Sequence, residues 1–224
     1  MEVTGPGPGT QGAGGFPGRI LAISPHTDDA ELGAGGAMAR WLREGRQVHL
    51  AAFSIAERSV AEGLPADVLL GESRESAAVL GVPAADLTTH RFEVRRFPES
   101  RQDILEALIG LREKLQPELV LLPASGDIHQ DHQTIANEGL RAFKHTSILG
   151  YELPWNLRDF RPGVFVILEK EDVDRKVAAV QCYRSQASRP YCDSDFIYGL
   201  ARVRGVQAQT RHAEAFECVR WFWR

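Results

Sequence analysis

Short apolar runs alternate along the chain with segments that carry apolar residues at helical spacing. Residues 20–23 form an apolar run that Ser24 and a proline end, a pattern typical of a buried strand. Residues 31–44 then carry apolar side chains at helical spacing and are followed by Gly45, after which residues 48–55 are apolar again. Strand, helix and strand within about 35 residues predict a βαβ unit.

The same alternation predicts the rest of the domain. We expect helices over 72–80, 101–115 and 133–144, and strands near 87–94, 119–122 and 148–151. Beyond Trp155 the spacing is less regular, with a strand expected at 164–168, a helix at 173–183 and apolar stretches at 196–203 and 215–223. No linker separates these segments, so we expect cap and edge elements of the same domain. The pattern as a whole predicts an α/β fold with a mostly parallel sheet.

The first 18 residues have a different composition from the rest of the chain. Seven of the 21 glycines lie there, and glycine and proline together fill ten of the 18 positions. Such a segment buries too little apolar surface to offset the entropy of ordering it. We therefore expect a flexible tail over residues 1–18 and a single catalytic domain over residues 19–224. This start has neither the basic nor the apolar region of a signal peptide.

Charge and cysteine content exclude several classes of protein. A net charge of −4 provides no general attraction for a phosphate polymer, which argues against nucleic acid as a partner. No apolar run approaches the length of a membrane span. The three cysteines are widely spaced, without a Cys-x-x-Cys pair, and fit neither a disulfide framework nor a thiolate zinc site. We expect a cytoplasmic protein, and the sequence leaves a homo-oligomer open.

Metal-ligand side chains gather in two loops that follow predicted strands. The first loop is residues 25–31, Pro-His-Thr-Asp-Asp-Ala-Glu, and the second is residues 127–132, Asp-Ile-His-Gln-Asp-His. These two loops contain three of the seven histidines of the chain. In open α/β sheets, ligands bind beyond the carboxyl ends of the strands, where both loops are expected. Either loop alone also fits a helix start whose aspartates complement the helix dipole, but the pair together favours a metal site.

A catalytic zinc site uses three nitrogen or oxygen ligands and leaves a fourth position for water. One histidine and one aspartate of the first loop, with one histidine of the second, would supply that set. The other aspartate of the first loop would then serve as general base. His129 is placed to stabilise the oxyanion or to donate a proton, and Asp131 to orient a histidine.

The two loops, taken together, resemble the LmbE-like or PIG-L family of zinc-dependent N-acetylglucosaminyl deacetylases. The resemblance rests on Pro-His-x-Asp-Asp followed by Glu-Leu-Gly-x-Gly-Gly, and on His-x-Asp-His about a hundred residues later. Weaker matches at residues 73–75, 80–81, 183–186, 204–205 and 213–216 extend it from about Arg19 to near the carboxyl terminus. Thr27 departs from the family pattern, which usually has proline there. The resemblance implies a Rossmann-like fold with the metal at the carboxyl ends of the strands.

The resemblance also implies the roles of individual residues. The zinc ligands would be His26, Asp29 and His132, although another divalent transition metal remains open. Asp28 would be the general base, and His129 would be the charged or proton-donating partner of the tetrahedral intermediate. Asp131 would support His129 or a ligand histidine. Arg74 matches an arginine that lies near the substrate in the family, although pairing with a neighbouring glutamate on the surface explains it equally well.

The implied reaction is metal-dependent hydrolysis of the acetamide of an N-acetylated sugar or glycoside. An amidohydrolase that acts on another small acylated metabolite is an alternative within the same chemistry. A metal-binding module without turnover is an alternative from a different class. The presence of Asp28 favours an enzyme over a metal-binding module, because a structural metal site needs no additional carboxylate.

Overall fold

The computed structural model describes residues 16–223. Its centre is a seven-stranded sheet in the order β3-β2-β1-β4-β5-β7-β6. The strands are β1 (Arg19–His26), β2 (Gln47–Ser54), β3 (Leu87–Thr89), β4 (Leu119–Pro123), β5 (Ser147–Tyr151), β6 (Val164–Leu168) and β7 (His212–Arg220). The pairs β2–β3, β1–β2, β1–β4 and β4–β5 are parallel, and β7 runs antiparallel between β5 and β6. The mostly parallel sheet predicted from the sequence is confirmed.

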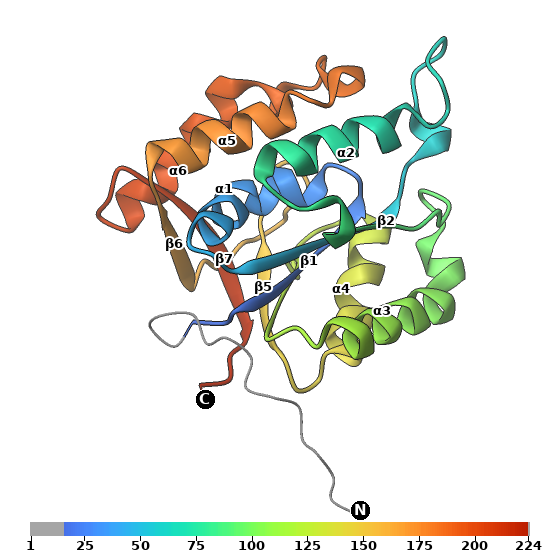
Figure 1. The fold of residues 1–224 in the computed structure, drawn as a ribbon, viewed down its shortest axis with the longest axis horizontal. Coiled ribbons are helices and arrows are strands. Elements are labelled where there is room, and N and C mark those ends of the chain that lie inside the picture. Colours follow the sequence, from blue (N-terminus) through green and yellow to red (C-terminus); the bar gives the residue numbers. More distant parts are fainter. Residues whose placement is uncertain (1–15, 224) are drawn as a thin grey trace, which may run out of the picture.

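Helices cover both faces of this sheet, as Figure 1 shows. One face packs against α1 (Asp29–Arg43), α2 (Val68–Leu80), α5 (Lys170–Val180) and α6 (Ser194–Gln207), and the other against α3 (Arg101–Leu115) and α4 (Gln130–Ala142). Along β1, Ile20 and Ala22 belong to the first of these layers, and Leu21 and Ile23 to the second. Successive side chains of a strand point to opposite faces, so a strand covered on both sides is apolar throughout.

Several predicted boundaries differ from the structure, among them those of α5, which covers Lys170–Val180 where residues 173–183 were expected. The second helix starts at Val68, four residues before the predicted start, and no side chain caps it. The fourth helix covers Gln130–Ala142, which is earlier than the predicted 133–144. The third strand is only Leu87–Thr89, because the chain then turns away from regular pairing. The amides of His90 and Phe92 still donate to carbonyls of β2.

The segment that leads into β1 packs against the domain. Residues 1–15 of the predicted tail lie outside the described part of the chain, and residues 16–18 contact the domain. The ring of Phe16 stacks on Trp41 with 5.5 Å between ring centroids, and lies 5.9 Å from that of Trp221. Arg46 donates to the carbonyl of Phe16 at 3.0 Å, and the amide of Gly18 donates to Glu118 at 2.6 Å. The aromatic ring therefore orders a segment whose glycine and proline content predicted flexibility.

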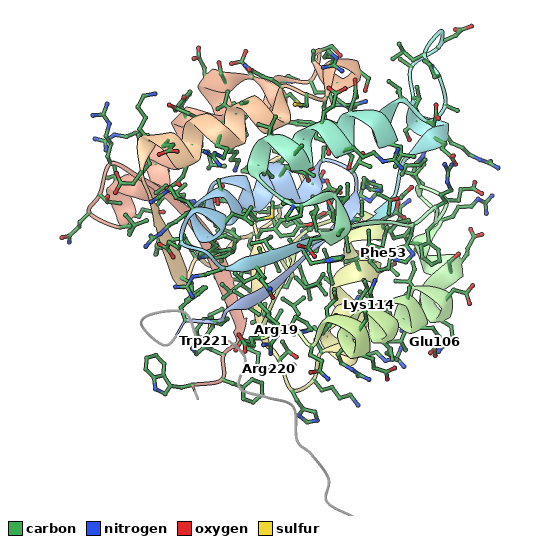
Figure 2. The ribbon with its side chains drawn as sticks, in the orientation of Figure 1. Arg19, Phe53, Glu106, Lys114, Arg220 and Trp221 are labelled. Atoms are coloured by element: carbon green, nitrogen blue, oxygen red, sulfur yellow. The ribbon has the colours of Figure 1, made fainter. Side chains whose placement is uncertain are left out.

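This aromatic cluster lies at the edge of the sheet where β1 begins and β7 ends. Figure 2 shows Arg19, Arg220 and Trp221 together at this edge, with Phe53 inside the molecule. The carboxyl ends of the parallel strands lie at the opposite edge. Both loops that carry metal-ligand side chains follow parallel strands, β1 and β4, and these strands are direct neighbours.

Glycines bring α1 close to the sheet. A Cβ atom at Gly33 would lie 2.2 Å from Cδ2 of Tyr151, and one at Gly36 would lie 2.6 Å from Cδ1 of Leu168. The hydroxyl of Tyr151 in turn donates to the carbonyl of Ile23 at 3.0 Å. Small residues at these positions seat the first turns of α1 directly behind the loop at residues 26–28.

Candidate metal and catalytic site

Three potential ligand atoms converge where β1 ends and α4 begins. Nδ1 of His26 lies 3.0 Å from Oδ2 of Asp29 and 3.3 Å from Nε2 of His132. Nε2 of His132 lies 3.3 Å from the same oxygen of Asp29. Ligands that bind zinc tetrahedrally at about 2.0–2.1 Å are about 3.3 Å apart. The three atoms therefore fit three corners of a tetrahedral zinc site, and their donor types suit that ion.

Two buried carboxylates fix the tautomers of the two histidines. Oδ2 of Asp131 lies 3.0 Å from Nε2 of His26, and Oδ2 of Asp127 lies 2.7 Å from Nδ1 of His132. Each carboxylate accepts the ring N–H that faces it, so the other ring nitrogen is directed toward Asp29. A cation held at this point would replace the proton that this second nitrogen shares with Asp29.

Backbone amides hold these two carboxylates in place. Asp131 accepts hydrogen bonds from the amides of Arg95 at 2.5 Å and Phe97 at 3.2 Å. Oδ1 of Asp127 accepts the amide of His129 at 2.8 Å. Arg95 has a φ of 69°, in the left-handed region, and lies in the turn that follows β3. The loop after β3 is therefore part of the support of the site.

His129 lies beside this set. It is the residue before α4, and its Nδ1 accepts the amide of Asp131 at 3.2 Å. A neutral ring in this position carries its proton on Nε2. His129 also has a ring nitrogen within 4.8 Å of ligand atoms of His26 and His132, so it is a further potential ligand. Oδ2 of Asp29 lies within 3.3 Å of a ring nitrogen of both His26 and His132, so Asp29 stays the predicted third ligand.

The surroundings of two neighbouring carboxylates, Asp28 and Asp29, shift their pKa values in opposite directions. Burial would raise the pKa of Asp29, but His132 and His26 hold it well below its ordinary value. Burial and the charge of Asp29 raise the pKa of Asp28 to about 6. Burial would lower the pKa values of the two histidines, but Asp29 and the carboxylates behind them raise that of His26 to about 9 and that of His132 to about 10. Asp29 is thus anionic between two rings, while Asp28 is the carboxylate that can exchange a proton.

The pKa values of the other two site residues shift downward. Burial, together with the nearby His132 and His26, lowers the pKa of His129. Burial would raise the pKa of Asp131, but its hydrogen bonds from His26 and from the Arg95 amide lower it. His129 is therefore a neutral ring and Asp131 an anion in this geometry.

The side chains face a cavity of about 280 Å³. Five of the predicted site residues line this cavity: His26, Asp28, Asp29, His129 and His132. Asp131 lies behind them and is fully buried. The sequence left open which histidine Asp131 supports, and the structure pairs it with His26.

Arg74 does not line this cavity. It is exposed on α2 and lines a separate hollow with Ala77, Val82 and Leu87. Along α2 the buried side chains include Leu69, Ser73 and Leu80, and Arg74 lies off that stripe. The expected substrate contact of Arg74 is therefore not supported, and Leu69 is the residue of α2 that reaches the cavity.

Several cavity residues escaped the sequence analysis. Asp127 was noted as part of the second loop without a role, although its spacing of five residues from His132 is a usable signal. A loop between α5 and α6 contributes Gln186, Arg189 and Tyr191, and nothing in its sequence indicates that it reaches β1. Trp155 also lines the cavity, and its ring stacks on Tyr191 with 4.0 Å between ring centroids.

Comparison with known proteins shows which family and which relatives this chain is similar to. The PIG-L family, described as GlcNAc-PI de-N-acetylase, matches residues 21–143. The uncharacterized deacetylase YaiS of Escherichia coli is 29% identical over 173 residues, which are 74% of this chain and 90% of YaiS.

Solved structures share the fold. The N,N'-diacetylchitobiose deacetylase of Pyrococcus horikoshii has a TM-score of 0.75 at 21% identity, covering 90% of this chain and 83% of its own. GalB of Pseudomonas putida, a 4-carboxy-2-hydroxymuconate hydratase, also has a TM-score of 0.75, at 22% identity, covering 91% of this chain and 97% of its own. Fold alone thus fits two reactions, whereas the family match covers both ligand loops. The chain belongs to the PIG-L family of de-N-acetylases.

Proposed function

We propose that the protein is a zinc-dependent hydrolase that removes the acetyl group from an N-acetylated sugar or glycoside. Membership of the PIG-L family assigns it to the hydrolytic N-deacetylases. The observation that carries the finer proposal is the convergence of His26, Asp29 and His132 on one point, with Asp28 beside them in the same cavity. A structural metal site would need no such additional carboxylate.

The residues of the cavity have distinct tasks in this proposal. A zinc ion held by His26, Asp29 and His132 would polarise the acetamide carbonyl and lower the pKa of water. Asp28 takes the proton from the attacking water. His129 donates a hydrogen bond or a proton from Nε2, either to the carbonyl oxygen as charge develops there or to the departing amine. Asp131 acts through His26 as a positioning residue.

The cavity wall supports a sugar as the acetylated substrate. Trp155 and Tyr191 are stacked with an interplanar angle of 9° and line the cavity with the ligand residues. Aromatic surfaces beside a few fixed polar groups are typical of sites for small organic ligands. The solved neighbour from Pyrococcus horikoshii acts on diacetylchitobiose, according to its name. An acylated metabolite other than a sugar is the alternative substrate.

The cellular setting is also part of the proposal. None of the helices within residues 16–223 is long and apolar enough to cross a membrane. The three cysteines, Cys182, Cys192 and Cys218, are free thiols, which is compatible with a reducing compartment. We expect the enzyme to act in the cytoplasm on a diffusible substrate.

Replacement of Asp28 tests the proposed function. We expect Asp28→Asn to reduce acetate release from N-acetylglucosamine glycosides by at least about 100-fold, because the amide cannot accept the proton. Bound zinc, measured by elemental analysis, should stay near one ion per chain, since Asp28 is not a ligand. Asp159→Asn is the matched control, because Asp159 is exposed and does not line the cavity.

Two results would contradict the proposal. Full activity of Asp28→Asn would remove Asp28 from the reaction. Zinc-loaded wild-type protein that releases no acetate from N-acetylglucosamine glycosides, but hydrates an unsaturated carboxylic acid, would favour the reaction of GalB over deacetylation.

A further inference from the structure

Arg189 lines the cavity and has only neutral hydrogen-bond partners among the residues that the structure describes. Nε of Arg189 donates to Oε1 of Gln186 at 2.5 Å, and Nη1 donates to the hydroxyl of Tyr191 at 2.7 Å. Within residues 16–223 no carboxylate forms an ion pair with it, although most arginines of this chain have such a partner. The remaining N–H groups of the guanidinium are available to a ligand.

The loop that carries Arg189 is firmly anchored. Ser185 donates its amide and its hydroxyl to the buried carboxylate of Glu72, at 2.9 and 2.6 Å. The amide of the Gln186 side chain donates to the Ser185 hydroxyl at 3.1 Å, and Gln186 is 7% exposed. Gln186 therefore presents its carbonyl oxygen to Arg189 from a fixed position. The guanidinium is held in place before any ligand arrives, which reduces the entropy lost on binding.

Arg189 lies at the same wall as the stacked aromatic rings. The Tyr191 hydroxyl that accepts from Arg189 belongs to the ring that stacks on Trp155. All three residues line the cavity that contains Asp28, and the positive charge of Arg189 is felt at the Asp28 carboxyl. A molecule whose acetamide reaches Asp28 and whose body lies against these rings therefore comes within reach of the guanidinium.

A planar guanidinium with free N–H groups and no anionic partner suits a carboxylate or a phosphate, which it can bind through two parallel hydrogen bonds. We propose that Arg189 selects N-acetylated substrates that carry an anionic group, carboxylate or phosphate, close to the acetylated sugar. This inference rests on the proposed deacetylase function and names the class of substrate for that site. A neutral glycoside leaves the guanidinium without its charge partner and is the poorer substrate.

Three glycosides of N-acetylglucosamine test this assignment with the zinc-loaded enzyme. The methyl glycoside is neutral, the carboxymethyl glycoside carries a carboxylate, and the 1-phosphate carries a phosphate. For the wild-type protein we expect kcat/KM on at least one anionic substrate to exceed that on the methyl glycoside about 10-fold or more. The better of the two anionic substrates identifies which anion the site prefers.

Substitution of Arg189 should remove this preference selectively. We expect Arg189→Gln to lower kcat/KM for the preferred anionic substrate about 10- to 100-fold, while the value for the methyl glycoside changes less than about threefold. Arg189→Lys keeps the positive charge but lacks the planar guanidinium. Its kcat/KM on the preferred anionic substrate should lie between the values of the wild-type protein and Arg189→Gln. Arg184→Gln is the matched control, since Arg184 is exposed in the same loop, pairs with Glu75 and does not line the cavity.

The outcomes separate this inference from the proposed function. Equal losses on charged and neutral glycosides in Arg189→Gln would assign Arg189 to the reaction or to the loop and overturn its role in selection. Equal kcat/KM values of the wild-type protein on all three glycosides would also overturn it, while the deacetylase function stands. Acetate release from none of them would overturn the function itself.

Discussion

Replacement of Asp131 by asparagine tests whether the carboxylates behind the histidines organise the metal site. Asp131 accepts three hydrogen bonds: from Nε2 of His26 at 3.0 Å, from the amide of Arg95 at 2.5 Å and from the amide of Phe97 at 3.2 Å. Both of its oxygens are therefore used as acceptors. Asparagine has only one oxygen, and its amide would face a donor whichever way it is oriented.

The free-energy cost of Asp131→Asn depends on which hydrogen-bond donor loses its acceptor. A buried donor left without an acceptor costs about 1–3 kcal/mol, and Asp131 is fully buried. If the amide faces His26, that ring loses the carboxylate that sets its tautomer. Loss of such support typically lowers metal affinity about 10- to 100-fold. If the amide faces Phe97, the substitution mainly lowers the free energy of unfolding. The zinc affinity and the free energy of unfolding, measured together, therefore report the orientation that asparagine adopts.

Two assays measure these effects separately. Competition with a chromogenic chelator gives the zinc dissociation constant, which we expect to rise about 10- to 100-fold in Asp131→Asn. Urea unfolding of the metal-free proteins gives the loss of stability, which we expect to be about 1–3 kcal/mol. Asp103→Asn is the control, because Asp103 is exposed on α3. Wild-type zinc affinity together with wild-type stability in Asp131→Asn would refute the reasoning.

Two further predictions concern packing and the metal. Gly33→Ala should lower the free energy of unfolding by about 1–3 kcal/mol, because its Cβ would overlap the ring of Tyr151. Gly110→Ala should instead raise that free energy by up to about 1 kcal/mol, because Gly110 is exposed on α3 with open space around it. Urea titration measures both, and an unchanged Gly33→Ala would disprove the close approach of α1. Removal of the metal by a chelator should abolish acetate release and lower the Tm, and zinc should restore both. Activity that survives exhaustive chelation would exclude the proposed role of the metal.

The layered fold was predictable because a strand that is buried on both faces appears in the sequence as an uninterrupted apolar run. Runs such as residues 20–23 are apolar at every position, since alternate side chains enter different cores. The exact ends of elements were less predictable. A strand was expected near residues 87–94, but regular pairing stops at Thr89. The chain turns there to carry the amides of Arg95 and Phe97 to Asp131, and backbone donors carry no signature in the sequence.

The convergence of the two loops that carry potential metal ligands was predictable for a different reason. They follow β1 and β4, which pair directly, so two motifs far apart in the sequence meet at one edge of the sheet. The loop around Arg189 reaches the same cavity only through the packing of α5 and α6, which local sequence does not specify. The resemblance suggested Arg74 as a substrate contact, but Arg74 lines a separate hollow on α2. Helical periodicity alone would have placed Arg74 outside, one position past the buried Ser73.

The start of α4 combines three tasks that are usually distributed over a site. His129 precedes the helix, Asp131 in its first turn orients His26, and His132 follows with its own ligand atom. These residues cannot move independently, because one helix carries them. The seating of α4 on the sheet therefore sets where His129, Asp131 and His132 lie relative to the loop that follows β1. That seating is close, since a Cβ at Gly139 would lie 2.7 Å from Leu122 of β4. A substitution that lifts α4 from the sheet should thus weaken metal binding even though it lies two turns away from the nearest ligand.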